Sequence, residues 1–133
     1  MIYALIALSA AVLITVIILM SNPLRWSNEH IRANMLKLTP IGTSMEDVIK
    51  VIESNEKWKI RSIRDNGYLL VGNIPAFPSS FYEHKHPIIG VKSIRAYLGE
   101  YRMIFAVGVS VFYGFDEDSK LIDIAVLKEG DSL

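Results

Sequence analysis

The start of the chain is almost uniformly hydrophobic. Residues 2–20 carry no charge, and only Ser9 and Thr15 have strongly polar side chains. A helix of that length extends about 28 Å, close to the roughly 30 Å hydrocarbon core of a bilayer. A signal peptide would have a basic start, a shorter apolar stretch and a small-residue cleavage site, and none of these precedes Pro23. The pattern therefore predicts a retained transmembrane anchor over residues 1–22.

The next stretch has apolar residues at helical spacing. Ile31, Met35 and Leu38 stand at i, i+4 and i+7, with charged residues between them. Ser27, or the asparagine after it, can cap the N-terminus, and a proline closes the segment. We therefore predict a helix from about residue 28 to residue 38, with one face turned toward a core.

A second helix follows a local capping signal. Thr43 and Glu46 have the spacing of a capping box, in which the threonine caps the helix and the glutamate bonds back to it. The residues that follow place their apolar side chains on one face and their charges on the other. This pattern predicts a helix over residues 44–54.

From residue 57 onward the period changes to two, which is typical of half-buried strands. Residues 74–90 show neither period and are predicted to form a long loop. The middle strand of the final meander is expected to place Val107, Val109, Val111, Tyr113 and Phe115 on one face. The predicted strands cover residues 57–61, 68–72, 91–104, 107–115 and 121–128.

The order of these elements predicts an α+β fold, in which two helices pack on an antiparallel sheet of four or five strands. With 133 residues, the chain has room for one such domain, residues 23–133, behind the anchor. The 14 basic residues balance the 14 acidic ones, so no overall field draws the protein to nucleic acid. The absence of cysteine excludes disulfides, thiol nucleophiles and cysteine-linked lipid.

The expected location is the inner membrane of a bacterium, crossed once. Arg25, Arg32 and Lys37 follow the apolar segment within the distance that the positive-inside rule counts. These charges favour a cytoplasmic position for the folded domain, although short N-terminal anchors also carry domains outward. The side of the membrane therefore stays open.

The sequence contains few candidates for chemistry. His84 and His86, beside Glu83, are the residue types that bind zinc or copper, but such sites need three or four ligands and His30 is distant in sequence. Ser79 and Ser80 lie near this pair without a nucleophile-elbow pattern. Acidic residues near the last turn lack the rest of a calcium loop and fit a solvated turn better; they are Asp116, Asp118 and Asp123. We therefore predict no catalytic residue, no metal and no cofactor.

Basic and aromatic side chains alternate along residues 91–104. Arg95, Tyr97 and Tyr101 are predicted to share one face of this strand. Such a face can bind nucleic acid or simply cover the sheet, and the second interpretation is favoured. Tyr and Arg are also frequent hot spots of protein interfaces. The predicted partner-binding residues are Phe77, Phe81, Tyr82, Arg95, Tyr97 and Tyr101. The alternative, in which the aromatic residues only pack the open end of the sheet, is equally consistent with the sequence.

Two segments carry a resemblance to a known family. Residues 40–48 read PIGTSMEDV and open the second helix, and residues 109–116 read VSVFYGFD and lead into an acidic turn. Over about 75 residues this pattern resembles the small domain of outer-membrane assembly lipoproteins of the SmpA/OmlA (BamE) type and of β-lactamase inhibitor modules. The chain departs from the lipoproteins because it has no anchoring cysteine and because residues 74–90 interrupt the strands.

The resemblance implies a module that binds another protein without catalysis. The small, aromatic-rich α+β domain also resembles bacterial immunity proteins, which neutralise a cognate toxin. The predicted function is therefore a membrane-anchored inhibitor or immunity-type protein. The alternative is a structural accessory subunit of a bacterial envelope assembly complex.

Overall fold

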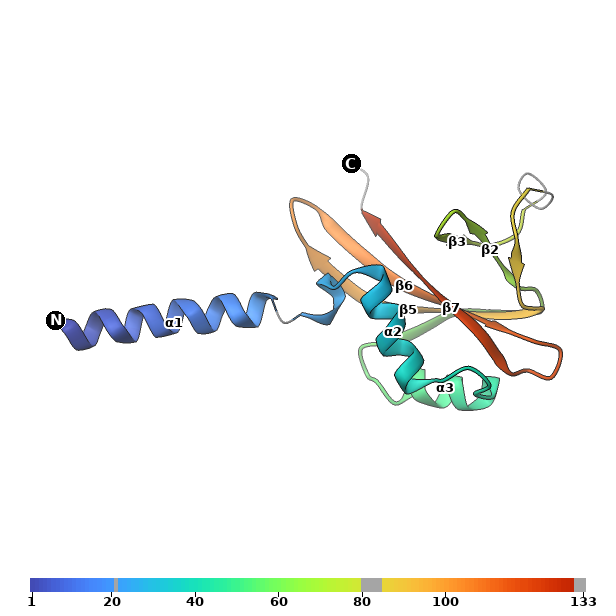
Figure 1. Ribbon diagram of the computed structural model, residues 1–133, viewed down its shortest axis with the longest axis horizontal. Coiled ribbons are helices and arrows are strands. Elements are labelled where there is room, and N and C mark those ends of the chain that lie inside the picture. Colours follow the sequence, from blue (N-terminus) through green and yellow to red (C-terminus); the bar gives the residue numbers. More distant parts are fainter. Residues whose placement is uncertain (21, 80–84, 131–133) are drawn as a thin grey trace.

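The structure is a computed structural model that describes residues 1–20, 22–79 and 85–130, without the side chains of residues 18–20. A long N-terminal helix leads into a folded domain in which helices and strands pack in layers (Figure 1). The described elements confirm the α+β fold class. In place of one sheet of four or five strands, they form an antiparallel sheet of four strands and a second sheet of three.

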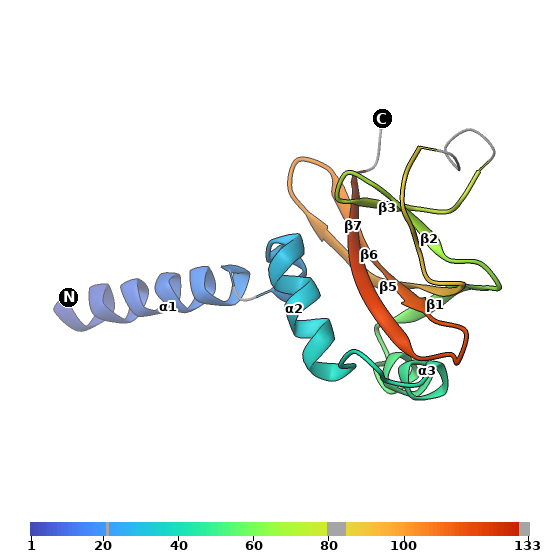
Figure 2. The same cartoon turned by 45° about the vertical axis from the view of Figure 1, so that its right-hand side comes forward.

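Helix α1 (Ile2–Met20) forms over the apolar segment and extends away from the domain (Figures 1 and 2). The described side chains of this helix are exposed, as expected for apolar residues with nothing packed around them. In residues 1–20, 22–79 and 85–130, no helix is both long and apolar enough to cross a membrane. The helix is confirmed, and the predicted transmembrane role of residues 1–22 is not supported by this finding.

Two short helices follow the 3₁₀ turn η1 (Pro23–Arg25). Helix α2 (Asn28–Leu38) begins where predicted, because the Ser27 hydroxyl accepts the backbone N–H of His30 and satisfies an otherwise free donor. This helix packs on the last strand of the large sheet.

Helix α3 (Met45–Glu53) begins one residue later than the capping-box prediction placed it. The cap is Ser44, whose hydroxyl accepts the N–H of Asp47 at 3.1 Å. The Thr43 hydroxyl instead donates to the Pro40 carbonyl and closes the preceding turn. The prediction of a Thr43 cap was therefore wrong, because two neighbouring hydroxyl residues compete for one cap position.

The large sheet has the order β1-β5-β6-β7, and all its neighbouring strands are antiparallel. The strands agree with the predicted ones to within three residues at each end. Only the first strand is shifted along the sequence, because it starts at Lys59 and not at residue 57. Their bounds are β1 (Lys59–Arg64), β5 (Lys92–Arg102), β6 (Ala106–Phe115) and β7 (Leu121–Gly130).

The segment between β1 and β5 forms the small sheet, in the order β3-β2-β4. Strand β2 (Tyr68–Val71) was predicted, whereas β3 (Ile74–Ala76) and β4 (Ile88–Ile89) lie in the predicted loop over residues 74–90. The two described ends of residues 74–90 therefore form β3 and β4, which pair with β2 on either side. The loop prediction was wrong at both ends, because strands of two or three residues are too short to show a period.

The two faces of the large sheet bury different side chains. On one face, α2 and α3 cover a core that includes Val109, Val111 and Tyr113, as the alternation of β6 predicts. On the other face, Phe112 packs with Tyr68 of the small sheet. The domain is thus layered as helices, large sheet and small sheet, and the small sheet covers only part of its face (Figure 2).

Candidate partner-binding surface

A β-bulge in β5 separates the side chains that the sequence placed on one face. Tyr97 pairs with Ser110, but the next pair is Gly99 with Val109, so Leu98 is an extra residue in the strand. An extra residue reverses the alternation of every side chain that follows it. Tyr101 therefore lies on the helix side of the sheet, and the prediction that it shares a face with Arg95 and Tyr97 was wrong.

Arginine and aromatic side chains gather on the opposite side, beside the small sheet. The Arg64 guanidinium lies 3.6 Å from the centre of the Phe77 ring, and that ring is 5.2 Å from the ring of Phe112. The Arg95 guanidinium lies 5.4 Å from the Phe112 ring. We call this surface the arginine–aromatic face; it comprises Arg61, Arg64, Phe77, Arg95, Tyr97 and Phe112.

Tyr97 forms the outer part of the arginine–aromatic face. The Arg61 guanidinium lies 4.7 Å from its ring. An added Cβ at Gly108 of the neighbouring strand would come within 3.3 Å of the Tyr97 ring. A glycine at this position thus leaves room for the ring, which is half-buried and open to contact from outside.

The arginine–aromatic face carries excess positive charge. Arg61 and Arg64 are exposed, and among the described residues Glu129 is the carboxylate paired with Arg95, at 3.8 Å. The Arg95 Nε atom is buried with no hydrogen-bond partner in the described structure. Guanidinium groups held on aromatic rings are ordered before binding, and they match carboxylate geometry. The chemistry of this surface therefore suits the binding of carboxylate groups.

The six predicted partner-binding residues have different outcomes. Phe77, Arg95 and Tyr97 lie together on the arginine–aromatic face. Tyr101 lies on the helix side, between Arg25 and Lys128, whose charged groups are 5.1 and 5.2 Å from the centre of its ring. Phe81 and Tyr82 fall outside the described residues.

Sequence reasoning missed three members of the arginine–aromatic face. Arg64 pairs with Ser93 across β1 and β5, and the face of the sheet on which its side chain lies can be assigned only when that pairing is known. Phe112 is almost fully buried and was overlooked because it alternates with the core residues of β6. Arg61 is the extra residue of a second bulge, between Ile60 and Ser62, and no sequence signal indicated it.

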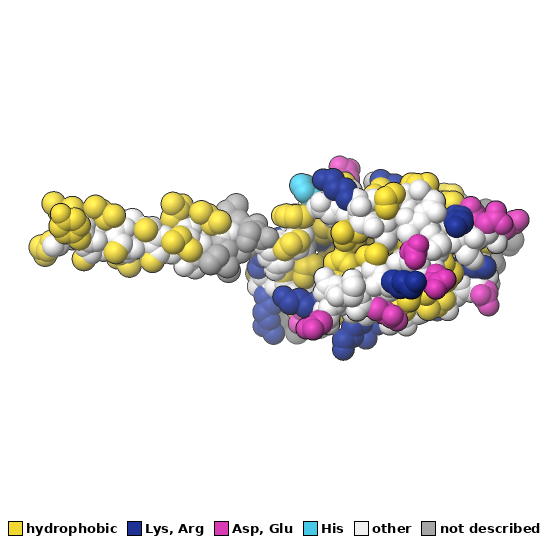
Figure 3. All heavy atoms as spheres, turned by 90° about the horizontal axis from the view of Figure 1, so that it is seen from below, with side chains coloured by type: hydrophobic (Ala, Val, Ile, Leu, Met, Phe, Trp, Pro, Cys, Tyr) yellow, Lys and Arg dark blue, Asp and Glu magenta, His cyan; other side chains and the backbone are white. Residues whose placement is uncertain are grey.

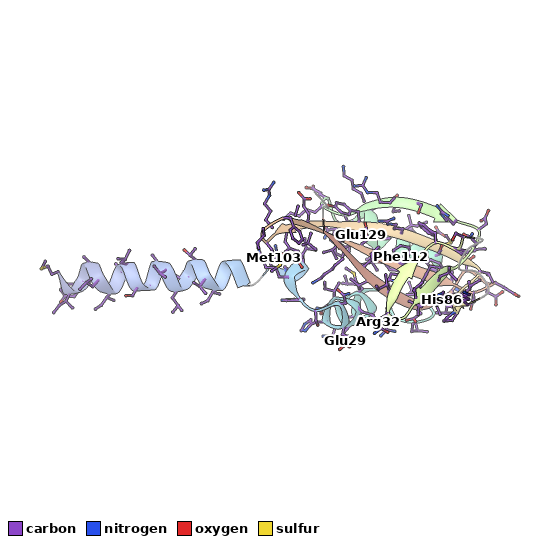
Figure 4. The ribbon with its side chains drawn as sticks, turned by 90° about the horizontal axis from the view of Figure 1, so that it is seen from above. Glu29, Arg32, His86, Met103, Phe112 and Glu129 are labelled. Carbon is purple, nitrogen blue, oxygen red and sulfur yellow. The ribbon has the colours of Figure 1, made fainter. Side chains whose placement is uncertain are left out.

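The candidates for metal binding and nucleophilic catalysis are dispersed. Among the described residues, no group of three or more His, Cys, Asp or Glu side chains is placed to hold a metal ion. The ring of His30 in α2 lies 4.6 Å from that of Trp26, at a tilt of 50°, whereas His86 lies at the far end of the domain (Figure 4). Ser79 is exposed. Glu83, His84 and Ser80 fall outside the described residues.

The acidic residues near the last turn do not converge either. One carboxylate oxygen of Asp116 accepts the N–H groups of Asp118 and Lys120 and shapes the turn. Asp123 instead pairs with Arg32 of α2 at 2.5 Å, and the same guanidinium donates to a β7 carbonyl. The contacts of Asp116 agree with the solvated-turn interpretation, whereas Asp123 lies in β7 and forms an ion pair with α2.

Two buried tyrosines have strongly altered pKa values. Burial, and to a lesser extent the Asp123 carboxylate, raises the pKa of Tyr68 far above its ordinary value, against a smaller effect of Arg32. Burial raises the pKa of Tyr113 in the same way. Both shifts follow mainly from desolvation, so they indicate packing.

An apolar groove lies on the helix side, between α2, η1 and β5. It has a volume of about 550 Å³. Trp26, Met35 and Trp58 are among the residues that line it. Figure 3 shows hydrophobic side chains on this face, close to the end of α1. Polar side chains also line the groove, among them Asn34, Lys57 and Glu100, and the buried Nδ2 atom of Asn34 has no hydrogen-bond partner in the described structure.

Comparison with known proteins finds no matching family model, curated protein or solved structure. The resemblances to assembly lipoproteins, inhibitor modules and immunity proteins therefore stay predictions. The function has to be argued from the surface itself.

Proposed function

We propose that the chain is a non-catalytic module that binds another protein through its arginine–aromatic face, and that α1 holds it at a membrane. The observation that carries the proposal is the arrangement of Arg61, Arg95 and Tyr97 on a part of the sheet that the small sheet leaves uncovered. Arginine and tyrosine dominate the hot spots of interfaces, because they combine large contact areas with directed hydrogen bonds. The partner would present carboxylates to this face.

The proposed membrane attachment rests on composition. Nineteen residues of α1 contain no charge, and the apolar side chains described for it are exposed, for example Leu5 at 65% and Leu13 at 61%. A helix that is apolar on every side and packs on nothing in its own chain would aggregate in water. A bilayer, in the bacterial inner membrane, would cover it.

The mode of action that we favour is inhibition, as in an immunity-type protein. Such a protein needs a stable, preorganised surface and no chemistry of its own. A second candidate is an accessory subunit of a bacterial envelope assembly complex. The succession of α2, α3 and the antiparallel strands favours it, because the resemblance to assembly lipoproteins implies the same order.

The proposal is testable by site-specific crosslinking in native membranes. A photo-crosslinking amino acid at Lys59, which is exposed and pairs with Tyr97 across β1 and β5, should capture a partner, and Arg61→Ala should abolish the capture. A central hot spot contributes about 2 kcal/mol or more, so Tyr97→Ala should weaken affinity at least about 25-fold. Lys50→Ala, an exposed position on α3, is the matched control. If all three variants bind equally, the face is not the interface.

The same complex distinguishes the two modes of action. An inhibitor lowers the activity of its purified partner in proportion to occupancy. An accessory subunit leaves that activity unchanged, and instead its removal lowers the yield of the assembled complex. Capture of envelope-assembly proteins alone would argue against the immunity-type interpretation.

A further inference from the structure

We propose that residues 103–105, the hairpin tip between β5 and β6, insert into the membrane interface next to α1. This inference rests on the proposed membrane attachment of α1, and it adds a second point of contact. The tip is Met-Ile-Phe, with exposed fractions of 68%, 98% and 48%. Three consecutive apolar residues exposed at a turn are unusual in a protein surrounded by water, and they indicate a contact.

The hairpin tip is held in an outward-facing shape. The N–H of Met103 donates to the carbonyl of Phe105 at 3.0 Å, which closes the turn. The Phe105 ring lies against Gly130 at the end of β7, where an added Cβ would come within 2.8 Å of it. Ile104, at the apex, makes no such contact and is almost fully exposed. The tip therefore presents apolar surface without burying it in the domain.

The hairpin tip lies where the chain leaves α1. Arg25 of η1 follows the helix closely in sequence, and its guanidinium donates to the Arg102 carbonyl at 2.6 Å. The Leu24 side chain lies close to Gly99 of the same hairpin. Figure 4 shows Met103 at the end of the domain nearest α1. A bilayer that contains α1 is therefore the surface nearest to the tip.

The side chains around the hairpin tip suit the headgroup region. Tyr101 stands near the end of β5, two residues before the tip, and Trp26 follows η1, whose Arg25 bonds to Arg102; both are residue types enriched at membrane interfaces. The Lys128 ammonium donates to the Trp26 carbonyl at 2.6 Å and lies on the Tyr101 ring, with Arg25 on the same ring. Such cations can reach lipid phosphates while their stems stay on apolar surface. A soluble protein partner would not require these aromatic and basic residues beside the tip, so the bilayer is the surface that the tip contacts in this proposal.

The absence of cysteine makes the test direct, because one introduced cysteine can be labelled alone. Ile104→Cys, Asp118→Cys and Ala11→Cys each carry an environment-sensitive fluorophore in the full chain. The second position lies in the β6–β7 turn, at the opposite end of β6, and the third lies in α1. Each protein is reconstituted into phosphatidylcholine–phosphatidylglycerol vesicles that contain nitroxide-labelled lipid.

We expect the label at position 104 to shift to shorter wavelength and to be quenched by nitroxides near the headgroups, while the label at 118 stays in water. Adding Met103→Glu should reduce the quenching at 104 at least about twofold, because a charge opposes insertion. If 11 is quenched and 104 behaves like 118, the inference is overturned and the anchoring by α1 stands. If 11 itself is not quenched, the proposed membrane attachment fails. Circular dichroism of each variant confirms the fold.

Discussion

Phe112→Ala should release the small sheet from the large one. Phe112 is 1% exposed, and its ring lies 5.7 Å from that of Tyr68 and 5.2 Å from that of Phe77. These contacts join β6 to the small sheet across the face that the helices do not cover. Truncating a buried phenylalanine to alanine costs roughly 3–5 kcal/mol, which includes the cavity left behind. Because a domain of this size is stable by about 5–15 kcal/mol, a loss of about 3 kcal/mol leaves the variant folded.

Phe112→Ala should destabilise the small sheet more than the rest of the domain, and two measurements separate these effects. Trp26 and Trp58 both pack on the helix side, so their fluorescence reports that core. Amide exchange of β2 (Tyr68–Val71) reports the small sheet. In Phe112→Ala, about 3 kcal/mol of lost docking energy should accelerate exchange in β2 at least about 100-fold, while the fluorescence in water stays unchanged.

Val109→Ala is the matched control on the other face of the same strand. Val109 is fully buried among the helix-side residues, so its truncation should lower the urea midpoint through the helix-side core. Exchange in β2 should then change little, because local opening of the small sheet does not break that core. The reasoning is refuted if Phe112→Ala costs less than about 1 kcal/mol, or if β2 exchanges at the wild-type rate.

Four further predictions follow from single contacts. Tyr68→Phe should stabilise the domain by about 1 kcal/mol in urea unfolding, because the buried hydroxyl has no partner among the described residues. Gly67→Ala should cost about 2 kcal/mol or more, because its Cβ would lie 2.2 Å from the Gly90 carbonyl oxygen; an unchanged midpoint would contradict this. Ser44→Ala should cost about 1 kcal/mol through loss of the α3 cap, measured by thermal unfolding. The contribution of Tyr68 and Tyr113 to stability should be constant below pH of about 10 and fall above it, because only the unfolded chain then releases their protons. Absorbance at 295 nm during alkaline titration should show both phenols ionising only on unfolding.

The regular elements were predictable because their side chains repeat over enough residues. Ten residues of β6 alternate between core and opposite face, so the helix-side residues, including Val111 and Phe115, follow from the pattern alone. Helix α2 has a hydroxyl cap and an apolar stripe, and both are local in sequence. A pattern of this kind needs no knowledge of what the element packs against.

The small sheet and the bulges were not predictable for the opposite reason. Strand β4 consists of two residues, and it exists only because β2 offers it a partner. The bulge in β5 contains Gly99 at φ +124°, and a glycine inside a strand is a sign of such an irregularity. That sign does not say which residue is extra. The face of Tyr101 therefore depended on the pairing with β6, which the sequence alone does not contain.

The candidate surface was predictable only in part, and its missing members share a cause. Phe77 was selected as an aromatic residue of the predicted loop and Tyr97 as one on a strand face, but the guanidinium groups that lie on their rings come from β1, which is distant in sequence. Arg61 reaches Tyr97 through the bulge in β1. The composition of such a face depends on which strand lies next to β5, and that is decided by tertiary packing.

The two proposed membrane contacts have a joint consequence for partner choice. One helix alone would let the domain turn freely about the end of α1, whereas insertion of the hairpin tip as well would fix one end of β5 and β6 at the bilayer. The arginine–aromatic face lies further along these strands, so it would then point sideways over the membrane surface. A partner held in the same membrane would meet it at an effective concentration in the range of about millimolar. A modest interface would then suffice, and we expect that affinity measured in solution underestimates binding in vesicles that carry both proteins.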